Sequence, residues 1–210
     1  MTQLKHHVSS VEWVRTLRIA NPPPSLLVRY TRKEKDFFYD YANFIVRTLQ
    51  DSTVIERISQ ILSIENVDLD SAIDIRIMVF PARSFRGQQN RMLHGSYNSD
   101  ASQISLYPVR VPKDWIRREG SGFFRQPYDS LSDRKRRLLL EIVEGAIGTL
   151  LHEIFHVKLG PRGMPRYVEE SIVKKMEAQY MSDLQETISS TVQRISDLNS
   201  VASQQAQTNP

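Results

Sequence analysis

Cysteine is absent from the 210-residue chain, and so is any long apolar run. The lack of cysteine excludes disulfide bonds, which fits a reducing compartment. Because no apolar run reaches about 18 residues and the N-terminus has no apolar core between its charges, neither a membrane span nor a secretory signal is expected. A cytoplasmic protein without a membrane partner is therefore predicted.

Charge is nearly balanced, with a formal net charge of +4. The excess lies in residues 1–35, which hold seven basic and two acidic residues. A second basic cluster, Arg-Lys-Arg-Arg, occupies residues 134–137, and we interpret it as solvated surface. Nucleic acid is therefore a secondary candidate partner, through these basic segments, and not the expected one.

The length and a hydrophobic content of 40% are typical of one domain with terminal extensions. The chain shows no internal repeat. Its ends are polar, and Asn-Pro-Pro-Pro-Ser at 21–25 indicates a linker or an extended segment. The expected organisation is a basic extended segment at 1–32, a single domain at 33–186 with amphipathic helices at 33–66 and a catalytic part at 74–186, and a polar helix with a disordered tail at 187–210.

The stretch LHEIFHVKLG at 151–160 contains the pattern His-Glu-x-x-His. Residues four apart lie on one face of an α-helix, so His152 and His156 can point ring nitrogens at a single metal ion. Glu153 is rotated by about 100° from His152, which places its carboxylate beside the open coordination position. A general base for a metal-activated water belongs there.

The surrounding sequence predicts a long helix, which Gly160 and Pro161 end. Gly145 and Gly148 precede His152 on its own face, and each costs about 1 kcal/mol of helix propensity relative to alanine. Such a cost indicates close approach by another backbone, either a crossing helix or a strand that lies against the site. Apolar residues recur at helical intervals at Leu139, Val143, Ile147, Leu150, Ile154 and Val157.

A catalytic zinc site usually takes three protein ligands, so two histidines require a partner. The other histidines are His6, His7 and His94, which makes a carboxylate the expected third ligand. A second predicted helix, which begins near Pro165, offers Glu169 and Glu170. Apolar periodicity places Glu169 near the centre of the buried face and Glu170 at its margin, and helical phase alone leaves both open.

The motif, the short turn and the glutamate on the next helix resemble the gluzincin metallopeptidases, and in particular the compact minigluzincins. In that family the glutamate helix often begins with proline, followed by an aromatic residue two positions later and the ligand after three more. Pro165, Tyr167 and Glu170 have this spacing. The resemblance implies one Zn²⁺ per chain bound by His152, His156 and Glu170.

The same resemblance implies a zincin-like α+β fold, with N-terminal helices and a small mixed or antiparallel sheet before the active-site helix and the glutamate helix. Its edge strand would bind extended substrate, and Ile-Ser-Leu-Tyr-Pro at 104–108 resembles that strand. Alternation also predicts a strand in residues 73–80, whereas residues 94–100 between them are rich in turn formers. Two departures are Ser171, where many members have glycine, and Lys174, where some members carry an acidic partner for a zinc histidine.

The expected function is that of a zinc metallopeptidase acting on a peptide or protein substrate, with Glu153 as the catalytic base and with self-inhibition as a zymogen left open. The alternative is a non-catalytic binding module, for nucleic acid among other partners, on a zincin-like scaffold. No residue is assigned to stabilise the oxyanion; the candidates are His94, Tyr97, Tyr107, Tyr167 and Tyr180.

Overall fold

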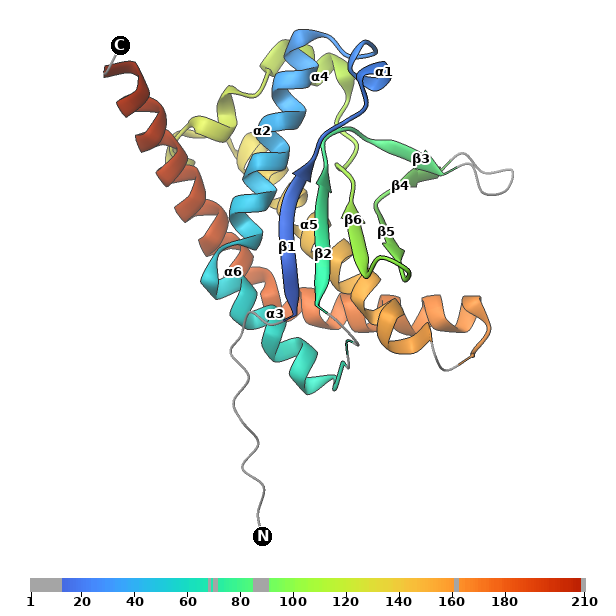
Figure 1. Ribbon diagram of the computed structural model, residues 1–210. Helices are drawn as coiled ribbons and strands as arrows, with labels where there is room; N and C mark the ends of the chain where they lie inside the picture. Colours follow the sequence, from blue (N-terminus) through green and yellow to red (C-terminus); the bar gives the residue numbers. More distant parts are fainter. Residues whose placement is uncertain (1–12, 68, 70–71, 85–90, 161–162, 209–210) are drawn as a thin grey trace.

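The computed structural model describes residues 13–67, 69, 72–84, 91–160 and 163–208 (Figure 1). Helices and a small mixed sheet make up this part of the chain, which confirms the α+β class predicted from the sequence. None of the helices described combines the length and the hydrophobicity that crossing a lipid bilayer requires.

Two amphipathic helices follow the first strand, as the periodicity of residues 33–66 predicted. Helix α2 (Arg32–Leu49) begins with a capping box, in which Thr31 and Glu34 each accept a hydrogen bond from the other's backbone N–H. Helix α3 (Ser52–Ile64) begins after Asp51, whose carboxylate accepts a hydrogen bond from the N–H of Thr53. Both helices bury one apolar face in the core.

A four-stranded sheet has the order β1-β2-β6-β5. Strands β1 (Val14–Ala20), β2 (Ile73–Met78) and β6 (Gln103–Leu106) are parallel, and β5 (Gly95–Asn98) runs antiparallel to β6. Along β2 the three isoleucines are buried and the alternate residues are not, so one face of the sheet carries the core. Helices α2 and α5 (Asp133–Leu159) cover that face (Figure 1).

The N-terminal segment differs from the expected extended extension. Residues 14–20 form β1 at one edge of the sheet, and the short helix α1 (Pro24–Leu27) includes the end of the segment at 21–25 that was expected to be a linker or extended. The pairing with β2 explains this, because Arg15 and Thr16 both bond the carboxylate of Asp74, with Arg15 Nη2 2.7 Å from it. The domain therefore includes residues from position 14 onward; residues 1–12 lie outside the described part.

The prediction that residues 104–108 form an edge strand was wrong. Most of that segment belongs to β6, which has β2 on one side and β5 on the other. The edge strand beyond β6 is β5, Gly95–Asn98, from the turn-rich stretch that precedes β6 in the sequence. Hydrogen bonding to β6 overrides the weak strand propensity of Gly-Ser-Tyr-Asn, because the sheet supplies partners for its backbone.

Shorter elements close the remaining sides of the fold. Strands β3 (Ala82–Ser84) and β4 (Arg91–Leu93) form a separate hairpin that leads into β5. Helix α4 (Lys113–Glu119) and the 3₁₀ turns η1 (Gly122–Arg125) and η2 (Tyr128–Ser130) connect β6 to α5.

Helix α6 (Arg166–Thr208) is the last element, and it continues to Thr208 through the segment at 187–210 that was expected to be a polar helix with a disordered tail. It passes below the sheet and then rises beside α2 (Figure 1). Its C-terminal half is ordered by packing and by capping of the 3₁₀ turns: Asp197 accepts from the N–H of Tyr128, and Ser196 donates to the carbonyl of Gln126. The apolar residues buried along it are Leu184, Ile188, Val192 and Ile195.

Candidate metal centre

The His-Glu-x-x-His motif lies at the C-terminal end of helix α5, in the interior of the molecule. Both glycines that precede the motif lie against neighbouring side chains, and of the two explanations left open by the sequence the helix crossing applies, at Gly148. A Cβ on Gly148 would lie 3.1 Å from Oε1 of Glu177 on α6, so this glycine marks a helix crossing. One on Gly145 would lie 2.8 Å from the side chain of Val109, which follows β6.

The two histidines face each other across one helical turn. Their Nε2 atoms lie 3.1 Å apart, and the ring planes are inclined by 72°. Both side chains are about one-fifth exposed, so the pair is largely buried but still reached by solvent. The geometry is that of two donors directed at one point, as the spacing of four residues predicted.

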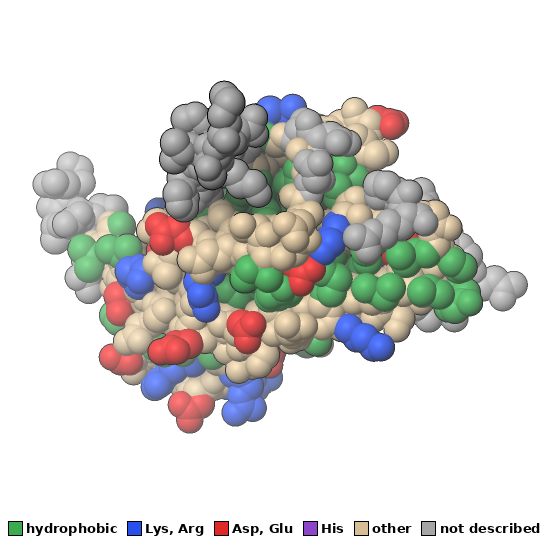
Figure 2. Space-filling view, turned by 90° about the horizontal axis from the view of Figure 1, so that it is seen from below, with side chains coloured by type: hydrophobic (Ala, Val, Ile, Leu, Met, Phe, Trp, Pro, Cys, Tyr) green, Lys and Arg blue, Asp and Glu red, His purple; other side chains and the backbone are tan. Residues whose placement is uncertain are grey.

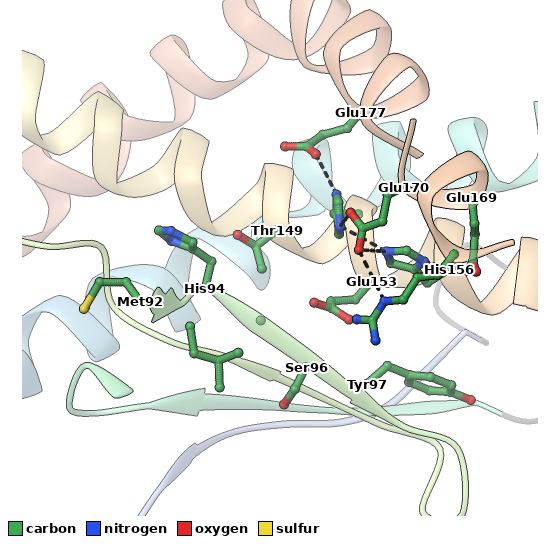
Figure 3. A pocket seen from close by; sticks show the side chains of 14 residues that line it. Met92, His94, Ser96, Tyr97, Thr149, Glu153, His156, Glu169, Glu170 and Glu177 are labelled. Atoms are coloured by element: carbon green, nitrogen blue, oxygen red, sulfur yellow. Dashed lines mark hydrogen bonds and ion pairs between the residues drawn. The ribbon is translucent and has the colours of Figure 1, made fainter. Parts of the chain in front are cut away.

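Glu170 on α6 faces this point. Its carboxylate oxygens lie 3.7 Å from Nε2 of His152 and 3.6 Å from Nε2 of His156. One ligand atom from each of the three residues falls within 4.8 Å of the others (Figure 3). The structure thus brings together the three residues that the resemblance named as ligands.

Two further glutamates hold the outer nitrogens of the histidine rings. Nδ1 of His156 lies 2.6 Å from Glu169, and Nδ1 of His152 lies 2.9 Å from Glu177. A carboxylate at Nδ1 keeps a proton there, so Nε2 presents its lone pair toward Glu170. Glu169 is therefore turned into the site as well, but toward the opposite nitrogen from Glu170.

Glu177 is a residue that the sequence reasoning missed. Lys174 stands where an acidic partner was sought, and the partner comes from the next turn of α6 instead. The available signal was spacing: Glu177 is seven residues, or two helical turns, after Glu170 and so lies on the same face. Its bond to His152 spans 25 residues of sequence.

The electrostatics of the site follow from its four glutamates and its partial burial. The hydrogen bond to Glu177 is the main reason that the pKa of His152 is raised above its ordinary value. Burial is the main reason that the pKa of Glu153 is raised, and the negative charge of Glu170 adds to it. A carboxyl group with a raised pKa is a stronger proton acceptor than an exposed one.

Strand β5 lies across the motif and sets the position of Glu153. The backbone N–H of Tyr97 donates a hydrogen bond to the Glu153 carboxylate. Gly95 makes this approach possible, because a Cβ there would collide with Cγ2 of Thr149 and lie 2.7 Å from Oε1 of Glu153. Between β5 and the two helices is a cavity of about 940 Å³, which we call the glutamate pocket; its lining includes both histidines and the four glutamates (Figure 3).

The five residues considered for the oxyanion separate into two groups. His94 and Tyr97 line the glutamate pocket, together with Arg166, which the sequence reasoning did not consider. Tyr180 instead donates a hydrogen bond to Glu65, at the end of α3, and Tyr167 is 78% exposed. The backbone N–H of Tyr107 bonds the carbonyl of His94.

Comparisons with protein families, with curated proteins and with solved structures give no match for this chain.

Proposed function

We propose that the protein is a zinc-dependent peptidase. The observation that carries this proposal is the convergence of Nε2 of His152, Nε2 of His156 and the carboxylate of Glu170 on one point, beside a buried carboxylate from Glu153. Two imidazoles and one carboxylate are a common ligand set of catalytic zinc in hydrolases.

The donor set fits zinc in chemistry and in size. Tetrahedral zinc with bonds of about 2.0–2.1 Å has donor atoms about 3.3–3.4 Å apart. The corresponding separations here are 3.1, 3.6 and 3.7 Å. With both Nδ1 atoms bonded to carboxylates, the three inward acceptors repel one another unless a cation or a proton lies between them.

Zinc at this position would supply Lewis acidity, which acidifies water and polarises a carbonyl. The chain's own residues then perform the remaining tasks. Glu153 accepts a proton from water at its carboxylate and returns it to the leaving amine, and its burial raises its pKa, which favours the first of these steps. The N–H of Tyr97 keeps that carboxylate oriented toward the pocket.

Strand β5 supports a peptide as the substrate. It is the sheet edge that borders the glutamate pocket, through Gly95, Ser96 and Tyr97. Within the described residues, no strand pairs with its outer side. An extended peptide that adds to this edge would place a carbonyl between β5 and the histidines.

The test is zinc content followed by cleavage of a peptide library. Protein reconstituted with zinc and dialysed is expected to retain about one zinc per chain. His156→Ala is expected to lose most of it, and Glu153→Gln to keep it while ending cleavage, because an amide accepts no proton. Glu144→Gln makes the same chemical change on α5 outside the pocket and serves as the matched control.

Two results would overturn the proposal in different ways. Protein without metal after reconstitution would show that the cluster does not bind zinc. Protein that binds zinc but gives no peptide products, or equal products from wild type and Glu153→Gln, would favour the non-catalytic binding module.

A further inference from the structure

A second hollow lies at the opposite end of α5 from the glutamate pocket. It has a volume of about 230 Å³ and lies between the chain after β6, helix α4 and the first turns of α5. Its floor is apolar and consists of Val111, Trp115 and Leu138. Val111 and Trp115 are more than nine-tenths buried, and Leu138 packs against the core. Its rim carries three arginines, Arg110, Arg134 and Arg137, and we call it the arginine hollow.

The structure divides the basic cluster at 134–137 into two pairs with different roles. Lys135 lies 3.5 Å from Glu119, and Arg136 donates to the carbonyl of Leu131 at 2.8 Å. Arg134 and Arg137, three residues apart and thus on one helix face, both line the arginine hollow. Only half of the cluster is therefore used within the fold.

The rim arginines have no counter-charge bound to them. In the part of the chain that the structure describes, Arg110, Arg134 and Arg137 make no hydrogen bond or ion pair, and all three are exposed. One acidic residue, Glu141, lines the hollow beside them. The face seen from below shows the ordinary case, with acidic and basic side chains interspersed (Figure 2).

We propose that the arginine hollow binds an acidic peptide segment that inserts one apolar side chain. Carboxylates suit the rim, because guanidinium groups bind them through paired hydrogen bonds. The floor suits an apolar anchor, and a volume of about 230 Å³ is below the roughly 300–1,000 Å³ of small-molecule sites.

A peptide fits better than single-stranded nucleic acid. Nucleic-acid grooves present exposed aromatic faces on which bases stack. Trp115 is only 6% exposed, so it offers an edge of the floor and no stacking surface. The acidic segment belongs to a partner protein, which would be bound by this end of α5.

The arginine hollow is separate from the candidate metal centre. Arg137 and His152 are 15 residues apart on α5, or about 22 Å along the helix axis. The two hollows also have opposite charge, since four glutamates line the other one. An acidic probe therefore discriminates between them, and this inference does not depend on peptidase activity.

The test is fluorescence anisotropy with a labelled heptapeptide that has a central phenylalanine between two acidic triplets. At low salt we expect saturable binding that weakens as salt rises, since screening acts within about 10 Å at 0.1 M. Neutralising two rim charges, in Arg134→Gln/Arg137→Gln, is expected to weaken binding on the order of tenfold. The matched control, Lys174→Gln/Lys175→Gln, removes two exposed charges from α6 and is expected to change it by less than about twofold.

The same assay with other ligands completes the experiment. A peptide with glycine in place of phenylalanine is expected to bind more weakly, because it leaves the apolar floor unfilled. Equal losses in both double variants would overturn the proposal, since they would show attraction to net charge alone. Arginine-dependent binding of an oligothymidine or of inorganic phosphate, with none of the acidic peptide, would overturn it in favour of a phosphate ligand.

Discussion

Replacing Glu170 with glutamine is expected to weaken zinc binding far more than the same change at Glu169. The two residues are adjacent and of the same type, and they change in the same way, so each is a control for the other. They differ in which nitrogens they face. Glu170 approaches both Nε2 atoms at 3.6 and 3.7 Å, whereas Glu169 lies 2.6 Å from Nδ1 of His156.

The expected magnitudes follow from these positions. Loss of a carboxylate that orients a ligand histidine costs about 10–100-fold in metal affinity. That range, about 1.4–2.8 kcal/mol, is expected for Glu169→Gln. Glu177→Gln is expected to fall in the same range, because Glu177 holds His152 in the same way at 2.9 Å. Glu170→Gln removes a charged donor from the ion itself and is expected to exceed about 100-fold.

The assay is zinc competition against a chromophoric chelator, with circular dichroism to show that each variant is folded. The reverse order, with Glu169→Gln the more damaging, would refute the assignment of Glu170 as the third ligand while leaving a zinc centre in place. If neither change affects zinc affinity, the proposed centre is wrong as a whole.

Three other changes test the surroundings of the site. Gly95→Ala places a Cβ against Thr149 and is expected to cost about 1–3 kcal/mol of stability and most of the activity; chemical denaturation checks this, and an unchanged midpoint would contradict the close approach. Tyr180→Phe removes the hydrogen bond to Glu65 that joins α6 to α3, with an expected loss of about 1–2 kcal/mol, visible as a lower Tm. The pKa of Asp74 is held well below its usual range, mainly by a hydrogen bond from an arginine. Its charge therefore contributes stability above pH of about 4 that is lost as pH falls toward the lowered value. Asp74→Asn is expected to be less stable than wild type at pH 7, by a margin that shrinks in acid; a margin independent of pH in urea titrations would contradict this.

Helices were the part of the fold that the sequence predicted well. The apolar periodicity of residues 33–66 and of 139–157 appears in the structure as α2, α3 and α5. The strand pattern was less informative, because alternation shows that one face of a strand is buried and says nothing about the strands on either side. The edge position of residues 104–108 came from the resemblance alone, whereas the structure places β6 in the middle of the sheet, with Ile104, Ser105 and Leu106 all buried.

The candidate site was also predicted well within a single helix and less well between elements. Spacing within α5 was sufficient to place His152 and His156 on one face, because a single helix fixes that geometry. Choosing between Glu169 and Glu170 was beyond helical phase, since an imidazole ring has two nitrogens and each glutamate meets a different one. Gly95 could not be foreseen either, because its closeness to Glu153 arises only when β5 pairs with β6.

Helix α5 has a charge separation of its own, which acts on both of its ends. Its aligned peptide dipoles are equivalent to roughly half a positive charge at the N-terminus and half a negative charge at the C-terminus. The rim arginines stand near the first end, and His156 lies in the last turn of the other, among the glutamates. The rim arginines thus have the same sign as the N-terminal end of the helix, and the glutamates have the same sign as its C-terminal end. The helix dipole therefore adds to the electric field of each group. Helix α5 and the charged groups at its two ends thus form an electric dipole, which would orient a charged partner before contact and raise the association rate, by an amount that falls as ionic strength rises.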